Sequence, residues 1–487
     1  MRAAIPKQLL LAGGLAVLSA ACAVGPEYRR PPVTTPDHFR GQATAGAGET
    51  SLGSEAWTSV FSDAGLQQLI RTALAQNEDL QIAAARILQV QAQLGIARAD
   101  QFPSVGAGAA LERERVSVIP GSDPLTANLG RADVSIAWQL DFWGRYRRAT
   151  EAARARLLAT EWGRRAVAAT LVSQVADGYY TLRALDLELD ISTRTLESRR
   201  ESLRLARARE QGGMTSLLDV HQAEQLVHGA GASIADLERR IAQQENAISV
   251  LLGQNPGDVA RGRPLVEQAQ GPELPAGLPS DLIARRPDIQ QAEQELVAAN
   301  AEIGVARAAY FPQIALTGSG GVVSTALTGL LSGATAVWTA AASVAQPVFT
   351  AGRTKSGVAL AEARRTEATL VYQRTVREAF REVADAIAGY RGAQQFREEQ
   401  EQVVEAADAA RRLVDSRYRG GVSSYLEVLD SDTRLYDAQL VLADARRAEL
   451  AAYVEFYRAL GGGWQPLATA SGGAAAAGSA AAAGSRR

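Results

Sequence analysis

The side chains that carry most enzymatic chemistry are scarce in this sequence. There is one cysteine, Cys22, and there are three histidines, His38, His221 and His228. The sequence therefore offers too few of these residues to favour a disulfide, a Cys/His metal site or a histidine-dependent catalytic triad. The glycine-rich run at 318–321 lacks the Lys-Ser/Thr that follows a phosphate-binding loop. We therefore predict that the chain is not an enzyme and that it uses no metal and no cofactor.

Cys22 has the most specific chemical context. Arg2 and Lys7 precede a short apolar run, which small residues connect to the cysteine. This pattern is typical of a secretory signal, and its apolar run is too short to span a bilayer. A lone cysteine at the cleavage site is similar to a bacterial lipoprotein signal, in which the thiol receives a diacylglycerol. We predict a signal peptide at 1–21 and lipidation at Cys22; the alternative is a plain secretory signal with an incidental cysteine.

A second group of reactive side chains lies near the end of the chain. Glu427 and Asp430 are three residues apart, so on a helix they share one face. If several copies surround an axis, each position becomes a ring of carboxylates, which favours and binds cations. The alternative is an ordinary solvated helix face.

The elements that position these residues come in two copies. Residues 96–103 read IARADQFP and residues 305–312 read VARAAYFP, 209 residues further on. The pair Gly212-Gly213 recurs as Gly420-Gly421 at a spacing of 208 residues. This period is far too long for a solenoid repeat, so it predicts a duplicated domain.

Each copy predicts the same series of elements from its hydrophobic periodicity and its turn residues. The series is a helix, a β-hairpin, a helix of about 67 residues that reaches roughly 100 Å, and a return helix. In the first repeat, residues 63–253, these elements are expected at 63–101, 104–142, 144–210 and 216–252. In the second repeat, residues 280–461, they are expected at 280–310, 313–348, 352–418 and 423–460. The remaining segments are a lipidated strap at 22–62, a connector at 254–279 and a low-complexity tail at 462–487.

The two hairpins give only four strands, each long enough to cross a membrane at a tilt. Open sheet edges cannot face lipid because their backbone polar groups would stay unsatisfied, and the smallest common membrane barrels have eight strands. The chain must therefore oligomerise or keep its hairpins out of the membrane. Aromatic residues cluster where each hairpin is expected to meet its helices, either as an interfacial girdle or as packing of the hairpin base. They are Trp138, Phe142, Trp143, Tyr310, Phe311, Trp338 and Phe349.

Motifs along nearly the whole mature chain resemble those of the outer membrane factor family, the TolC/OprM-like channels, and especially its NodT-type lipoprotein branch. The first is the segment CAVGPEY at 22–28, followed by Pro31. The second-repeat segments are RRPDI at 285–289 and AAYFP at 308–312. The segment YRGG at 418–421, followed by YLEVLD at 425–430, resembles the tip of the family's periplasmic helices.

This resemblance implies a mainly α protein with membrane β-structure, assembled as a homotrimeric α/β-barrel. Three chains would form a twelve-stranded outer-membrane barrel and long antiparallel periplasmic helices. The resemblance further implies a passive duct for drugs or other small toxic compounds. Its partners would be a periplasmic adaptor, an inner-membrane RND-type transporter and outer membrane lipid. Ala23 follows the cysteine in place of the aspartate that retains lipoproteins at the inner membrane, which favours the outer membrane.

The resemblance also assigns roles near the tips. Tyr418 matches the family's gating tyrosine and Asp219 its first-repeat partner, beside the Glu427 and Asp430 rings. Some members carry an arginine five residues after the tyrosine, where this chain has Ser423. The nearby candidates for a substitute lock are Arg417, Asp432 and Arg434. Gly212, Gly213, Gly420 and Gly421 permit tight turns that suit docking of an adaptor.

Two other functions remain open from the sequence. A type I protein-export duct would share the same architecture. A lipid-anchored coiled-coil scaffold would explain the long helices but not the two matched hairpins. A nucleic-acid partner is not expected, because the formal net charge is −2.

Overall fold

The computed structural model describes residues 23–41, 51–116, 125–268, 277, 279–325 and 335–464. The predicted signal peptide, the predicted lipidation site Cys22 and the tail beyond residue 464 lie outside the described residues. The chain divides into two compact units, and each takes segments from both repeats. Unit 1 contains residues 1–33, 85–162 and 290–375, and unit 2 contains residues 34–84, 163–289 and 376–487.

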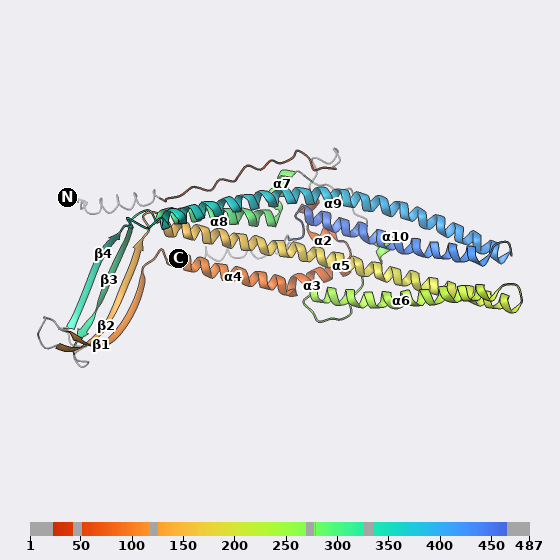
Figure 1. The fold of residues 1–487 in the computed structure, drawn as a ribbon, viewed down its shortest axis with the longest axis horizontal. Coiled ribbons are helices and arrows are strands. Elements are labelled where there is room, and N and C mark those ends of the chain that lie inside the picture. Colours follow the sequence, from red (N-terminus) through yellow and green to blue (C-terminus); the bar gives the residue numbers. More distant parts are fainter. Residues whose placement is uncertain are drawn as a thin grey trace, which may run out of the picture. The chain divides into compact units, whose positions relative to one another are not determined.

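Long helices dominate the described chain (Figure 1). Helices α5 (Arg145–Gln211) and α9 (Arg353–Arg419) each have 67 residues, as predicted for both repeats. The return helices α6 (Leu217–Leu251) and α10 (Tyr425–Ala459) each have 35 residues. Among the described residues, no helix combines the length and the apolar character needed to cross a membrane.

The two predicted hairpins are confirmed and form one antiparallel sheet in unit 1. The strands are β1 (Ser104–Val116), β2 (Leu125–Leu140), β3 (Gln313–Ser324) and β4 (Ala336–Ala345), in the order β1-β2-β3-β4 (Figure 1). The repeats meet at the β2–β3 pair, where Leu140 lies opposite Ile314 and Gly130 opposite Ser324. Within the described chain, β1 and β4 each pair on one side only.

The sheet leaves large apolar side chains exposed on its strands. Val105 and Leu111 of β1 are 69% and 71% exposed, and Trp338 and Val344 of β4 are 81% and 67% exposed. Every residue of β4 is exposed. Because burial of apolar surface is the main favourable contribution to folding, a sheet like this requires an apolar environment or further strands.

The prediction of one helix over 63–101 is wrong, because two helices occupy this segment. They are α3 (Ala64–Gln76) and α4 (Glu78–Ala99), separated by Asn77 in an extended conformation. The Asn77 side chain accepts a hydrogen bond from the Leu80 N–H at 3.1 Å and donates to the Leu251 carbonyl at 3.1 Å. Asparagine thus caps α4 while it terminates α3, and the apolar spacing alone did not reveal this break.

The prediction of one helix over 280–310 is wrong for a related reason. The segment forms α7 (Pro279–Arg285) and α8 (Pro287–Ala308), with Arg286 between them. Pro287 disfavours the helical conformation of the preceding residue and starts the next helix well. Arg286 is 5% exposed and donates to the Ala459 carbonyl at 3.1 Å and to Asp288 at 2.6 Å.

Short helical turns occupy parts of the predicted strap and connector. They are η2 (Leu52–Ser54), α2 (Trp57–Val60) and η3 (Leu265–Glu267). Trp57 and Phe61 are each 1% exposed, and the Phe61 ring meets the Tyr457 ring edge-on at 5.7 Å. Residues 51–62 are therefore packed against α10, and the prediction of an entirely extended strap is wrong here.

The first described residues of the strap are bound within unit 1. The Val24 N–H donates to the Trp143 carbonyl at 3.0 Å, and Asn300 donates to the Pro26 carbonyl at 3.0 Å. Arg30 donates two hydrogen bonds of 2.7 Å to the carboxylate of Glu293, which is 5% exposed. The strap thus reaches the junction between β2 and α5 at Val24, two residues after Cys22.

Asp63 is a buried acid that joins distant segments of unit 2. Its carboxylate accepts hydrogen bonds from Tyr179 at 2.8 Å, from Gln268 at 2.6 Å and from the Arg263 N–H at 2.9 Å. It also caps α3 through the Gly65 N–H at 2.7 Å. Burial acts to raise the pKa of Asp63, but these donors together bring the pKa below its usual value.

We expect Asp63→Asn to lower the free energy of unfolding by about 2–3 kcal/mol, because an amide cannot satisfy these donors as a carboxylate does. Since the folded state lowers the pKa, the contribution is present above the unfolded pKa of about 4 and is lost as the pH falls further. Thermal unfolding followed by circular dichroism at pH 7 and pH 3 measures both effects. Asp258→Asn, at an exposed loop acid, is the control. Equal stability of Asp63→Asn and wild type at pH 7 would contradict the assignment.

Candidate functional site

Both helix tips end in the same hydrogen-bonded motif. The Met214 N–H donates to the Arg209 carbonyl and the Val422 N–H to the Arg417 carbonyl, each at 2.9 Å. These bonds, with Gly213 and Gly421 at φ +71° and +76°, are Schellman caps. The predicted tight turns are therefore present. The space around both glycines is open, since no atom in the described chain lies within 4 Å of an added Cβ.

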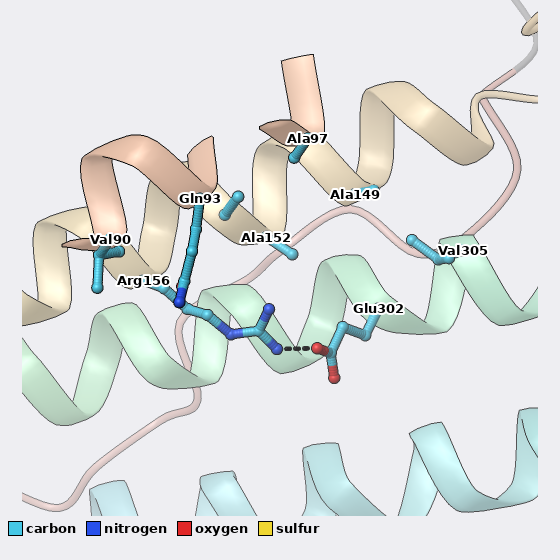
Figure 2. A pocket seen from close by; sticks show the side chains of 9 residues that line it. Val90, Gln93, Ala97, Ala149, Ala152, Arg156, Glu302 and Val305 are labelled. Atoms are coloured by element: carbon cyan, nitrogen blue, oxygen red, sulfur yellow. Dashed lines mark hydrogen bonds and ion pairs between the residues drawn. The ribbon is translucent and has the colours of Figure 1, made fainter. Parts of the chain in front are cut away.

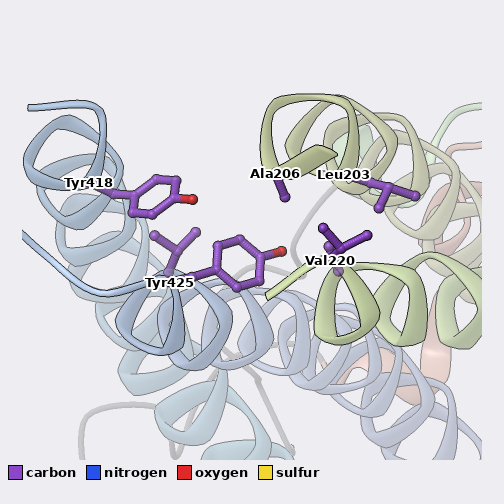
Figure 3. Packing of buried hydrophobic residues seen from close by; sticks show 7 residues of the cluster. Leu203, Ala206, Val220, Tyr418 and Tyr425 are labelled. Carbon is purple, nitrogen blue, oxygen red and sulfur yellow. The ribbon is translucent and has the colours of Figure 1, made fainter. Parts of the chain in front are cut away.

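Tyr418 lies in an apolar cluster of unit 2 with Leu203, Ala206, Val220 and Tyr425 (Figure 3). Its ring packs against the Tyr425 ring at 5.6 Å. The Tyr418 hydroxyl is buried and has no hydrogen-bond partner in the described part of the chain. Burial raises the pKa of Tyr425 to about 12, so this tyrosine stays neutral.

Arg209, which the sequence analysis missed, holds Tyr418 in place. Its guanidinium lies 4.4 Å from the centroid of the Tyr418 ring and donates to the Tyr418 and Arg419 carbonyls at 3.2 and 3.3 Å. Arg209 therefore ties the end of α5 to the end of α9. Its place in the last turn of a helix was the available signal, since cations favour that end of the helix dipole.

Asp432, one of the proposed substitute locks, forms a buried ion network. Arg199 of α5 donates to its carboxylate at 2.8 Å, and Arg411 of α9 lies 3.6 Å from its other oxygen. The side chains of Arg199 and Asp432 are 6% and 11% exposed. We call Arg199, Arg411 and Asp432 the tip clamp.

Further contacts connect the tip clamp to its surroundings. Arg199 donates to the Leu226 carbonyl of α6 at 3.2 Å, and its guanidinium lies 5.0 Å from the Tyr436 ring centroid. The Tyr436 hydroxyl in turn hydrogen-bonds the fully buried Ser192 at 2.9 Å. The clamp and its contacts therefore join α5, α6, α9 and α10, which belong to both repeats.

The two predicted ring carboxylates are both exposed to solvent. Glu427 completes a capping box at the start of α10 with Ser424 and accepts a further hydrogen bond from Ser423 at 3.0 Å. The Ser424 N–H and these hydroxyls lower the pKa of Glu427, so it remains charged. Asp430 pairs with Arg434 at 2.7 Å on the same helix. Glu427 therefore caps α10 and also carries a negative charge that is exposed to solvent.

The remaining predicted gate residues are not joined in one lock. Arg417 is exposed, and Arg434 binds Asp430 on its own helix. Asp219 accepts a hydrogen bond from Thr215 in the first turn of α6. Within the described residues, no hydrogen bond joins Asp219 to Tyr418, so the structure does not show that expected pair.

The predicted interfacial aromatics divide into two groups. Trp143 stacks on Phe311 at 4.7 Å and donates to the Pro312 carbonyl at 2.7 Å, so these rings pack the hairpin base. Phe142 precedes Trp143 in the sequence and is partly buried. Trp138 is 38% exposed and Phe349 is 87% exposed, so both can contact an external apolar phase.

The expected position of Trp338 is wrong. Trp338 pairs with Gly320, which pairs with Val134. Val134 precedes Trp138 by four residues on β2, which corresponds to roughly 13 Å along the strand. Trp338 therefore lies near the end of the sheet away from the helix junction, two residues after β4 begins at Ala336.

A groove of about 270 Å³ in unit 1 lies between α4, α5 and α8 (Figure 2). Its lining consists mainly of small side chains, with one ion pair between Arg156 and Glu302. It contains no nucleophile and no pair of unmatched acids, so we assign it no chemistry. In the described part of the chain, no three His, Cys, Asp or Glu side chains converge to hold a metal ion.

Comparison with known proteins gives a consistent similarity. A model of the outer membrane efflux protein family matches residues 69–254 and 278–462. The probable efflux pump outer membrane protein TtgC of Pseudomonas putida is 36% identical over 465 residues, covering 94% of this chain and 96% of that protein. The cation efflux system protein CusC of Escherichia coli is 32% identical over 457 residues, covering 93% and 98%.

The similarity extends to solved structures. The open state of the MtrE outer membrane channel of Neisseria gonorrhoeae superposes with a TM-score of 0.82 at 31% identity, covering 91% of this chain and 99% of that chain. The similarity therefore includes the hairpins, the long helices and the tips.

Proposed function

Since the chain belongs to the outer membrane efflux protein family, we propose that three copies form a passive duct that exports drugs or other small toxic compounds. The family membership confirms the resemblance predicted from the sequence motifs and identifies an outer membrane protein. The proposed duct is closed at its helix tips and carries no catalytic site of its own.

The observation that carries this proposal is the four-stranded sheet. Its edge strands β1 and β4 lack outer partners in the described chain, and apolar side chains are exposed along both. Three such sheets supply twelve strands, enough for a closed membrane barrel, whereas one sheet would leave its edges unsatisfied. A coiled-coil scaffold offers no reason for these strands.

We propose that the gate consists of the tip clamp and the tyrosine cluster, with Glu427 and Asp430 as carboxylate rings at the constriction. The clamp links helices of the two repeats through charges that are shielded from water. Separating α10 from α5 would break the ion pair between Arg199 and Asp432 and leave both charges without a partner. The clamp therefore favours the closed tip. Exposed Glu427 and Asp430 are free to face a water-filled channel.

We propose that the thiol of Cys22 carries the lipid anchor. The adjacent residues Ala23 and Val24 are fixed beside Trp143 and Gly144, where β2 meets α5. Consecutive Cα atoms are 3.8 Å apart, so an acyl chain on Cys22 would start close to the hairpin base. The hairpin base is also where the proposed membrane boundary lies.

We propose a periplasmic adaptor and an inner-membrane RND-type transporter as partners. The names of TtgC and CusC describe an efflux pump component and a cation efflux component. In this chain, large apolar side chains are exposed at both tips beside the Schellman glycines, which suits contact with an adaptor. They are Met214 at 74%, Leu217 at 57%, Leu218 at 63%, Val422 at 71% and Leu426 at 62% exposure.

Deleting the gene in its native host tests the proposed duct. We expect greater sensitivity to toxic small molecules, restored by the wild-type gene, and a trimeric channel with measurable conductance from the purified protein. Loss of one secreted protein with unchanged sensitivity would favour a type I export duct. An elongated monomer without conductance would contradict the channel proposal.

A further inference from the structure

The strand-to-helix junctions of unit 1 carry the same motif in both repeats. Gly144-Arg145-Tyr146-Arg147 begins α5 after β2, and Gly352-Arg353-Thr354-Lys355 begins α9 after β4. The two motifs are 208 residues apart, which is the spacing of the repeat itself. Each places two cations at the start of a long helix, beside the sheet (Figure 1).

The first copy provides a partner for each of its two cations. The Arg147 side chain lies 3.6 Å from the carboxylate of Asp141 and donates to the Asp141 carbonyl at 3.2 Å. The guanidinium of Arg145 lies 5.7 Å from the centroid of the Tyr146 ring. Both cations of this junction therefore have partners within the chain.

The second copy lacks these partners. At the position of Asp141 it has Phe349, and at the position of Tyr146 it has Thr354. The sequence contains no Asp or Glu between Glu302 and Glu362, and Glu362 is paired with Arg307. Arg353 and Lys355 are exposed, and among the described residues neither side chain forms an ion pair. This junction therefore presents unmatched positive charge.

Exposed apolar side chains lie directly before these cations. Val348 is 94% exposed and Phe349 is 87% exposed. Apolar side chains that are followed within a few residues by cations fit a lipid boundary. There the apolar side chains enter the acyl region and the cations contact the phosphates. A soluble anion would account for the cations but not for the exposed Phe349.

We propose that the second-repeat junction, Val348, Phe349, Arg353 and Lys355, binds anionic glycerophospholipid in the membrane leaflet that faces the periplasm. The first-repeat junction has a weaker preference because Asp141 neutralises Arg147 and the Arg145 guanidinium lies over the Tyr146 ring. This inference rests on the proposed placement of the hairpins in the membrane. It adds a lipid headgroup preference that the duct itself does not require.

Quenching of tryptophan fluorescence by brominated lipids tests the inference with the full-length protein. Vesicles contain either dibrominated phosphatidylglycerol or dibrominated phosphatidylcholine, and Trp138, whose indole donates to the Gln101 carbonyl at the hairpin base, reports acyl contact. We expect the wild type to prefer phosphatidylglycerol by up to about 25-fold, since each of the two cations contributes roughly fivefold near an anionic surface. The double variant Arg353→Gln, Lys355→Gln should bind both lipids equally.

Phe349→Asp is a second variant. It places an acid at the position that Asp141 occupies in the first copy, offsets one of the two cations and should lower the preference. Arg86→Gln, at an exposed arginine of α4 outside the junction, is the matched control and should keep it. Equal quenching of the wild type by both lipids would overturn this inference alone. Absence of quenching by either lipid would reject the membrane placement in the proposed function. Loss of the preference in inorganic phosphate, but not in chloride of equal ionic strength, would assign the site to free phosphate.

Discussion

Replacing Asp432 with alanine is expected to raise the single-channel conductance of the protein in planar lipid bilayers several-fold. Asp432 accepts the 2.8 Å hydrogen bond from the buried Arg199 and lies 3.6 Å from Arg411. Without the carboxylate, two arginines face each other with no anion between them. The closed arrangement of the tip helices therefore loses its stabilising contact.

The size of the effect follows from burial. Removing one partner of a buried ion pair typically costs about 3–5 kcal/mol, because the other charge stays in a low-dielectric site. If opening the tip hydrates Arg199, a cost of about 3 kcal/mol shifts the closed-to-open ratio roughly a hundredfold. Cells that produce this variant should also become leaky to large antibiotics.

Two controls separate gating from general damage. Asp236→Ala removes an exposed acid that pairs with Arg239 on the same helix, and it should leave the conductance unchanged. The double variant Arg199→Met, Asp432→Leu replaces the ion pair with apolar side chains and should restore most of the closure. Wild-type conductance of Asp432→Ala would show that the clamp does not hold the tip.

Asp430→Asn is expected to weaken the block of the channel by a trivalent cation such as La³⁺ by at least about tenfold. In a trimer this change removes three carboxylates from one ring. Each contributes about 1 kcal/mol at a distance of 4 Å in water, and 1.4 kcal/mol corresponds to tenfold. The partner Arg434 is exposed, so solvent weakens its pairing with Asp430 and it offsets only part of this charge.

The block is measured as the reduction of single-channel current with increasing concentration of the cation on the tip side. Tyr418→Phe is the informative control, because its hydroxyl has no partner to lose in the described chain. We expect that variant to keep both the conductance and the block of the wild type. An unchanged block in Asp430→Asn would place the cation site elsewhere.

Local patterns were sufficient to predict most elements. The long helices follow from 67-residue stretches without proline, and their ends follow from the glycine pairs that form Schellman caps. The breaks at Asn77 and Arg286 were missed, since the apolar spacing continues across both. Asn77 is extended because its side chain binds the Leu251 carbonyl, a contact 174 residues away.

The candidate gate was only partly predictable. Asp432 was named as a possible lock, but its partners Arg199 and Arg411 were not. Arg199 is 233 residues from Asp432 and is one of many arginines on α5. Periodicity identifies a helix face, but it does not identify which of several cations that face buries.

The sequence by itself determined the duplication, the element types and the family, because these depend on local periodicity, turn residues and motif spacing. Only the tertiary structure decided which charges are buried, since burial depends on how α5, α6, α9 and α10 pack. It thereby distinguished the shielded Asp432 from the exposed Glu427 and Asp430, although all three lie within six residues. The free energy of a charge depends on its surroundings, and those surroundings come from both repeats.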